Sequence, residues 1–201
     1  WFSKAAAQGN EDAQNNLGTM YSDAQGITKD KVKAFEWYGK AAAQGHVDAQ
    51  YNLGVMYERG EGVAQSYAKA VEWYSKAATQ GDSYAQNNLG VMYSKGLGVT
   101  QNDAKAFEWY SKAASHGHVY AQNTIGGKYQ KGLGVTQSNI KAFEWYSKAA
   151  AQGDAYAQYN LAEMYKSGQG VTQNNAKAFE WYSKAADQGH AQAKLMLARL
   201  Q

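Results

Sequence analysis

The sequence predicts an all-α protein, a solenoid of antiparallel two-helix repeats, and three observations support this prediction. Apolar residues recur at the spacing of amphipathic helices. Glycines take the place of prolines as helix terminators, since the 201 residues include 21 glycines and no proline. The tryptophans recur every 36 residues, at Trp1, Trp37, Trp73, Trp109, Trp145 and Trp181. A fixed period of this length is typical of stacked structural repeats.

The first helix of each repeat is illustrated by residues 46–81. Leu53, Met56 and Tyr57 fall at helical spacing and form one apolar stripe. We expect this helix to end at Gly60, because glycine adopts the left-handed conformation that commonly follows a helix end. The glycines that follow then continue the connection to the next helix.

The second helix of each repeat starts after a residue whose side-chain oxygen can accept a free backbone N–H. These N-cap residues are Asp30, Ser66, Asn102, Ser138 and Asn174. The helix then carries Trp73, Tyr74 and several alanines, and it ends at Gly81. Because alanines let two helices approach closely, we expect Trp73 to fill the space between adjacent repeats.

The repeats divide the chain without interruption, and we assign residues 1–201 to a single domain. Residues 1–9 are the end of a preceding repeat and 190–201 are a closing helix. The five whole repeats are 10–45, 46–81, 82–117, 118–153 and 154–189. One repeat alone leaves its apolar face open, so stability comes from stacking. We expect upstream residues or self-association to cover the N-terminal end.

Two recurring motifs resemble those of the Sel1-like repeat family, which is related to the tetratricopeptide repeats. They are a G-x-G-V element, as in Gly60–Val63, and the run K-A-x-E-W-Y-x-K-A-A. The resemblance covers essentially the whole chain and implies a right-handed superhelical α-solenoid. It further implies a non-catalytic scaffold or adaptor that binds other proteins. Because several bacterial members are exported, it favours a periplasmic or secreted location in a bacterium.

Two repeats depart from the pattern. In the first repeat Ala24 replaces the helix-ending glycine, so we expect a disturbed turn there. In the fourth repeat, Gly126, Gly127 and Lys128 replace the usual Gly-Val-Met. The extra glycine lowers helix propensity by about 1 kcal/mol, which predicts a weak helix. We interpret this segment as a structural compromise, with a functional role as the alternative.

Several function classes are excluded by composition and periodicity. The chain has no cysteine, which rules out disulfides, thiolate zinc sites and a cysteine nucleophile. Carboxylates that recur once per repeat, such as Glu72, do not converge on one reacting atom, so we predict that the chain is not an enzyme. His46, His118 and His190 share the position before a first helix, where helix entry explains them. We therefore predict no metal site and no cofactor.

The net charge of +3 is small and scattered, and no apolar run reaches the length of a membrane span. We therefore predict neither a nucleic-acid partner nor membrane insertion. Stacked helical pairs bind extended partners on a concave surface. By analogy with tetratricopeptide repeats, this surface is formed by the third, sixth, tenth, thirteenth and fourteenth residues of each repeat, here named the first-helix face. Our candidate partner-binding residues on it are Asp48, Tyr51, Val55, Glu58, Arg59, Tyr84, Asn87, Lys95, Tyr120, Asn123, Lys131, Tyr156, Tyr159 and Glu163.

The charges on the first-helix face nearly cancel along the chain, and tyrosines and amides are frequent on it. This composition favours a protein or peptide segment as the partner. A scaffold for protein interactions is therefore the leading hypothesis. Two alternatives are a binder of small molecules or glycans in a tyrosine-lined groove, and the interaction domain of a larger enzyme.

Overall fold

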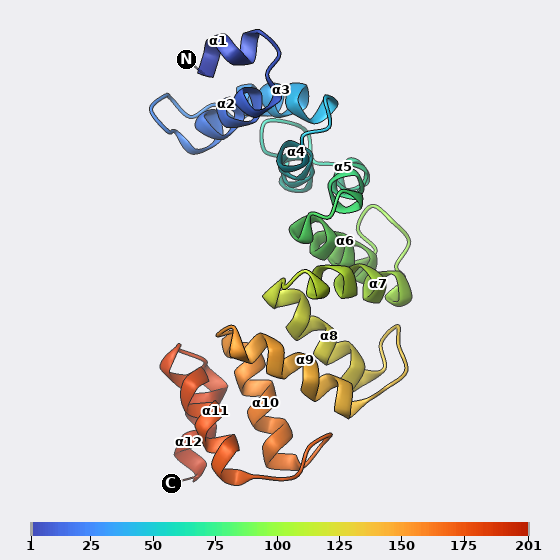
Figure 1. Cartoon of the computed structure of the whole chain (residues 1–201), viewed down its shortest axis with the longest axis vertical. Coiled ribbons are helices and arrows are strands. Elements are labelled where there is room, and N and C mark those ends of the chain that lie inside the picture. Colours follow the sequence, from blue (N-terminus) through green and yellow to red (C-terminus); the bar gives the residue numbers. More distant parts are fainter. Residues whose placement is uncertain (1, 201) are drawn as a thin grey trace. The chain divides into compact units, whose positions relative to one another are not determined.

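The computed structural model describes residues 2–200, with side chains from 3 to 199, and its regular structure there is entirely α-helical (Figure 1). The helices run in the order α1 (Phe2–Ala7), α2 (Glu11–Asp23), α3 (Lys31–Ala43), α4 (Val47–Arg59), α5 (Tyr67–Thr79), α6 (Ser83–Lys95), α7 (Asp103–Ser115), α8 (Val119–Lys131), α9 (Asn139–Ala151), α10 (Ala155–Ser167), α11 (Asn175–Asp187) and α12 (Ala191–Leu200). Even-numbered helices are the first helices of the repeats and odd-numbered helices are the second. The predicted all-α architecture of paired helices is confirmed.

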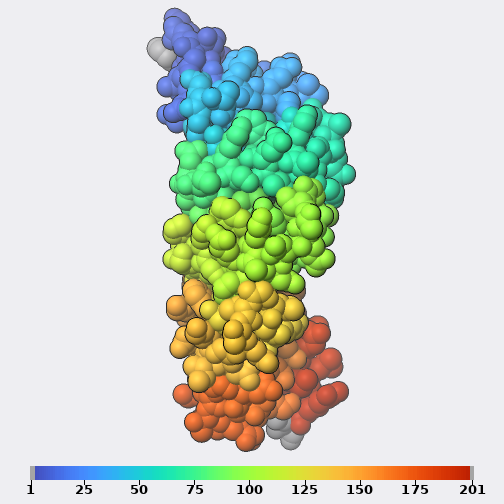
Figure 2. Space-filling model, turned by 90° about the vertical axis from the view of Figure 1, so that its right-hand side faces the viewer, coloured from blue at the N-terminus to red at the C-terminus, as the bar shows by residue number. Residues whose placement is uncertain are grey.

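Two compact units are distinguished, Trp1–Asn102 with helices α1 to α6 and Asp103–Gln201 with helices α7 to α12. Within each unit, every helix packs against the helix before it and the helix after it. Figure 2 shows the repeats of each unit as successive layers. Each unit is therefore a stack in which a repeat packs mainly on its neighbours. The assignment of the whole chain to one domain stays a prediction.

The helices start where the side chains predict. The side chains of Asp30, Ser66, Ser138 and Asn174 each accept a backbone N–H from the first turn of the second helix. The three histidines that directly precede a first helix act in the same way. For example, Nδ1 of His46 accepts the Ala49 N–H at 3.3 Å. Helix entry therefore accounts for His46, His118 and His190, as predicted.

The turn after the first helix keeps its geometry in every repeat, including the first. Gly60 has a φ of 70°, and its N–H bonds to the Met56 carbonyl. Ala24 has a φ of 59°, and its N–H bonds to the Met20 carbonyl in the same way. The expectation of a disturbed turn at Ala24 is therefore wrong. The left-handed conformation costs a non-glycine residue about 1–2 kcal/mol, which the packing of the two helices outweighs.

The second glycine of the G-x-G-V motif makes a contact between repeats. A Cβ atom on Gly62 would lie 2.1 Å from the carbonyl oxygen of Lys31, in the first turn of the preceding repeat's second helix. In the second unit, a Cβ atom on Gly134 would lie 2.1 Å from the carbonyl oxygen of Asp103. Only a residue without a side chain allows this approach. The motif therefore joins neighbouring repeats. From the sequence we expected it only to connect the two helices within one repeat.

The aromatic core differs in one respect from the prediction. Trp73 does lie between repeats, because it packs against a cluster that includes Tyr38 and Leu53, but it remains partly exposed. The fully buried aromatic residue is its neighbour Tyr74. The outer side of the Trp73 ring is covered by Lys76, whose Nζ lies 3.9 Å from the ring centroid.

The fourth repeat carries a buried ion pair. Lys128 is buried, and its Nζ lies 2.9 Å from Oδ1 of Asp103, the first residue of α7. Helix α8 is 13 residues long, like the other first helices of whole repeats, so Gly127 does not interrupt it. The lysine thus has a structural partner in the preceding repeat. This geometry favours the structural interpretation of the unusual segment.

The Gly62 contact predicts different costs for two matched substitutions. Gly26 holds the same repeat position as Gly62 and a similar φ of 73°, but no atom lies within 4 Å of a Cβ atom built there. We expect Gly62→Ala to cost about 1–3 kcal/mol more than Gly26→Ala, because only the former forces the backbones apart. Urea unfolding of both variants measures the difference. Equal losses would show that the loop does not depend on the contact.

The ion pair predicts opposite outcomes for its two partners. Asp103→Asn leaves the Lys128 ammonium buried without a counter-charge, so we expect a loss of about 1–3 kcal/mol in the free energy of unfolding. Lys128→Met restores the residue of the other repeats and removes the desolvated charge, so we expect stability to be unchanged or higher. Tryptophan fluorescence during urea unfolding provides the measurement. A larger loss for Lys128→Met would contradict the structural role.

Candidate functional site

The predicted partner-binding residues lie on four first helices, which belong to two units. Residues 48–59 lie on α4 and 84–95 on α6 of the first unit, and 120–131 lie on α8 and 156–163 on α10 of the second. Their role in binding stays a prediction.

In the first unit, tyrosines from adjacent repeats meet on the first-helix face. The Tyr51 ring centroid lies 6.1 Å from that of Tyr84 and 5.9 Å from that of Tyr74. Tyr84 is 60% exposed, whereas Tyr51 is half-buried. Burial raises the pKa of the Tyr51 hydroxyl above its ordinary value, and the Asp82 carboxylate adds to this effect. The structure therefore brings two predicted residues, Tyr51 and Tyr84, into one aromatic cluster.

A half-buried carboxylate adjoins this cluster. Tyr74 donates its hydroxyl hydrogen bond to Oε2 of Glu58. Burial and this hydrogen bond to a carboxylate both raise the pKa of Tyr74. The next residue, Arg59, pairs with Glu61 and not with Glu58: its Nη1 atom lies 3.8 Å from Oε1 of Glu61. Among the side chains that the structure describes, Glu58 forms no ion pair with a lysine or arginine.

Two buried amide oxygens of the first unit lack a hydrogen-bond donor. Asn87 is 8% exposed and Asn15 is 9% exposed, and the Oδ1 atom of each has no partner. Both residues occupy the sixth position of a repeat, which Tyr51 occupies in the repeat between them. Buried polar atoms normally have partners. The sixth position therefore holds an unpaired, buried acceptor in the repeat on either side of Tyr51.

In the second unit, His190 joins two of the predicted tyrosines. The Tyr159 ring stacks on the His190 ring at a centroid distance of 4.7 Å, and the Tyr156 ring meets it edge-on at 5.0 Å. Tyr182 donates its hydroxyl hydrogen bond to Glu163. Tyr159 is therefore held by packing, whereas Tyr156 is 66% exposed.

The remaining predicted residues are distributed over the surface. Asn123 accepts a hydrogen bond from Nδ2 of Asn160 at 3.1 Å, so part of its amide is already used between repeats. Val55 is half-buried. Five further predicted residues are exposed: Asp48, Arg59, Lys95, Tyr120 and Lys131. The predicted set thus contains both accessible surface and residues with structural contacts.

A row of glutamines was missed in the sequence. Nε2 of Gln50 donates to the Ala42 carbonyl of the preceding second helix at 3.3 Å. Its Oε1 accepts from Nε2 of Gln80, at the end of its own repeat's second helix, at 2.8 Å. The buried members of this row are Gln14, Gln50, Gln86, Gln122 and Gln158. Their recurrence at one repeat position could have identified them in the sequence. They form a structural amide link between neighbouring second helices.

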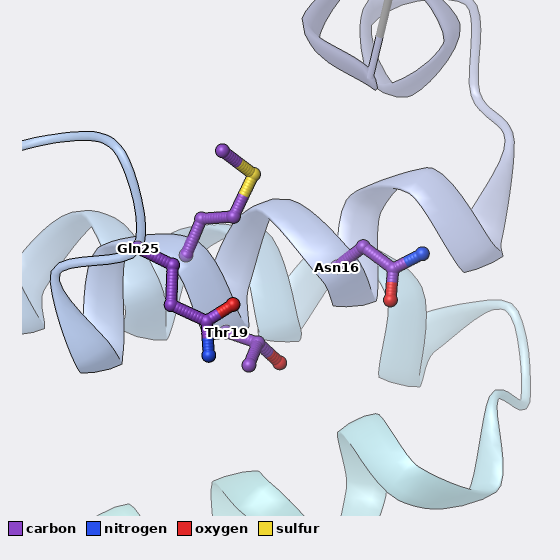
Figure 3. Close-up of a pocket in the computed structure, with 4 residues that line it drawn as sticks. Asn16, Thr19 and Gln25 are labelled. Atoms are coloured by element: carbon purple, nitrogen blue, oxygen red, sulfur yellow. The ribbon is translucent and has the colours of Figure 1, made fainter.

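One pocket lies in the first unit, with a volume of about 400 Å³ (Figure 3). Its lining residues are Asn16, Thr19, Met20 and Gln25. These groups supply amides, a hydroxyl and a thioether but no charge. Met20 is half-buried, whereas its counterpart Met56 is buried beside the second helix of the preceding repeat. The pocket thus leaves partly accessible a side chain that packing covers at the same position of the next repeat.

No group of three or more histidine, aspartate or glutamate side chains in residues 2–200 is placed to hold a metal ion. No helix in this part of the chain combines the length and apolarity needed to cross a membrane.

Comparison with known proteins identifies the family. The Sel1 repeat model matches residues 1–10, 11–46, 47–82, 83–118, 119–154 and 155–190. A comparison with curated proteins gives no match. Among solved structures, c5321, a protective antigen of uropathogenic Escherichia coli with an SLR fold, is 42% identical with a TM-score of 0.97. The match covers 100% of this chain and 43% of the antigen, so the chain spans less than half of that protein.

Two other solved structures extend the comparison. A Sel1 repeat protein of Oxalobacter formigenes is 38% identical with a TM-score of 0.87, over 95% of this chain and 76% of that one. Immunity protein Pa5087 of Pseudomonas aeruginosa is 26% identical with a TM-score of 0.57, over 91% and 67% of the two chains. Together with the six matched segments, these likenesses show that the chain belongs to the Sel1 repeat family, whose helical repeat fold is related to that of the tetratricopeptide repeats.

Proposed function

We propose that this protein is a non-catalytic scaffold that binds a segment of another protein on its first-helix face. The observation that carries the proposal is a set of exposed tyrosines at the third position of three repeats. Tyr84 is 60%, Tyr120 is 56% and Tyr156 is 66% exposed. The first two whole repeats fold with Asp12 and Asp48 at this position. Packing therefore does not require these tyrosines.

Exposed tyrosine is well suited to recognition. Its ring offers a large contact area, its hydroxyl forms hydrogen bonds, and few rotatable bonds are lost on binding. The names of the relatives, a protective antigen and an immunity protein, describe no catalytic activity. The likeness to the Escherichia coli antigen also supports our proposal of a periplasmic or secreted location in a bacterium.

A second candidate function rests on the pocket of the first unit. Its volume of about 400 Å³ lies within the range of small-molecule sites, and its amides and hydroxyl suit a neutral polar ligand such as a sugar. Self-association through the N-terminal end stays a prediction. Calorimetric titration with neutral sugars, and light scattering at increasing protein concentration, separate these uses from peptide binding. A role as the interaction domain of a larger enzyme stays a prediction.

The scaffold proposal predicts that two exposed tyrosines are needed for binding but not for folding. For Tyr84→Ala combined with Tyr120→Ala, we expect the affinity for peptides selected from a random phage-displayed library to fall by about 1–2 kcal/mol for each of these two anchors that a peptide contacts. The melting temperature should hardly change, because both side chains are exposed. Fluorescence anisotropy of labelled peptides measures the affinity.

The matched control is Ile140→Ala, which removes an exposed apolar side chain from the second helix α9. It should leave peptide affinity unchanged. Peptide binding that depends on Ile140 and survives loss of both tyrosines would place the binding surface on the second helices.

A further inference from the structure

The first-helix face of the first unit is acidic, although the chain as a whole is basic. The whole chain has a net charge of +3. On α2 and α4, however, the face positions carry four carboxylates against one cation, Arg59, and α6 adds one further cation, Lys95. The carboxylates are Asp12, Asp23, Asp48 and Glu58. Glu58 is half-buried and the other three are more accessible to solvent. Attraction on this face therefore favours a cationic partner.

Arg59 pairs with a carboxylate in the loop after α4. Arg59 approaches Glu61 on the following turn, and Oε2 of Glu61 also lies 2.7 Å from Nζ of Lys31. Hydrogen bonding to the Lys31 ammonium lowers the pKa of Glu61. Arg59 thus belongs to the network around Glu61. The charge of Glu58 is left without a counter-ion among the described residues.

Glu58 lies beside aromatic rings that can share a cation with it. Tyr74 bonds to its carboxylate, and the Tyr51 ring packs against Tyr74. A carboxylate binds an ammonium or guanidinium group by charge-assisted hydrogen bonds, and a tyrosine face adds cation–π attraction. The chain already uses such pairing elsewhere, since Nζ of Lys40 lies 3.9 Å from the Trp37 ring centroid.

Two amides in the repeats on either side of Tyr51 each have an oxygen without a hydrogen-bond donor. The Oδ1 atoms of Asn15 and Asn87, at the sixth position on either side of Tyr51, are nine-tenths buried and unpartnered. An unpaired buried acceptor costs free energy, and because both Oδ1 atoms are buried, a ligand donor pairs with one only if the amide turns toward the surface. Backbone N–H groups and lysine or arginine side chains supply such donors.

We propose that the first-helix face of the first unit binds an extended protein segment that carries lysine or arginine, with one cation seated between Glu58 and the Tyr51 ring. This inference rests on the proposed scaffold function and defines the chemistry of its partner. The acidic face, made by Asp12, Asp23, Asp48 and Glu58, attracts the remaining positive charge of the segment. A phosphate backbone or an acidic segment is repelled.

Glu58→Gln tests the proposal without disturbing the fold. In the fourth repeat Gln130 holds the position of Glu58, and its Oε1 accepts the Tyr146 hydroxyl at 3.1 Å. The amide introduced by the substitution can therefore accept the Tyr74 hydroxyl in the same way. The matched control is Glu72→Gln, which neutralises an exposed carboxylate on the second helix α5 of the same repeat.

The experiment uses the full chain and a random phage-displayed peptide library. We expect the selected peptides to be enriched in lysine and arginine, although the positive net charge of the protein would by itself select acidic peptides. For a labelled selected peptide, Glu58→Gln should weaken binding about 5- to 10-fold, near 1 kcal/mol, and Glu72→Gln should leave it unchanged. Replacing the lysines or arginines of the peptide with alanine should weaken binding to the parent chain.

The outcomes separate this inference from the scaffold proposal. Peptides that bind through Tyr84 or Tyr120 but show no enrichment in basic residues would overturn the inference and leave the scaffold standing. Equal affinity of Glu58→Gln and the parent chain for a basic peptide would also overturn it. Failure to select any peptide sensitive to the two tyrosines would overturn both.

Discussion

The contact between a second-helix tyrosine and a first-helix glycine determines how the first, second and fourth repeats are built. A Cβ atom on Gly54 would lie 2.4 Å from the Tyr74 ring, and one on Gly126 would lie 2.7 Å from the Tyr146 ring. The missing side chain lets the tyrosine ring enter the helix pair, where it is buried. Its hydroxyl then reaches the first-helix face and needs an acceptor there. The fifth repeat places Ala162 in the glycine position, so a methyl group can be accommodated when the surrounding repeat is built with it.

This contact links the core to the candidate binding face. Glu58 in the second repeat and Gln130 in the fourth accept the tyrosine hydroxyl, and Thr19 in the first shares a hydrogen bond with Tyr38. The acceptor differs between repeats because any side-chain oxygen at this surface satisfies the hydroxyl. The fold therefore tolerates variation in charge at this place. A carboxylate chosen among equivalent acceptors adds negative charge to the face without changing the packing, which is the basis of our inference about Glu58.

Contacts between repeats divide into those that recur and those that occur once. The Gly62 approach and the Gln50 amide link recur, so they serve the stacking that every repeat requires. The ion pair of Lys128 with Asp103 breaks the methionine pattern at one interface of the second unit. The exposed tyrosines likewise occupy a position that carries aspartate in other repeats. Recurrence thus separates structural residues from candidates for recognition, and the Sel1 repeat family assignment accounts for the former alone.

The sequence by itself determined the period, the helix pairs and the helix ends, because these depend on residues only a few positions apart. Asp30 caps its helix through a backbone N–H three residues on, and Gly60 closes the preceding turn locally. Only the tertiary structure decided that Tyr74 is more deeply buried than Trp73, that Ala24 keeps its turn, and that Glu58 meets a tyrosine hydroxyl. These outcomes depend on packing between helices, where the free energy of many contacts outweighs a local preference. A one-dimensional pattern records which residues recur but not the distances between side chains that belong to different helices.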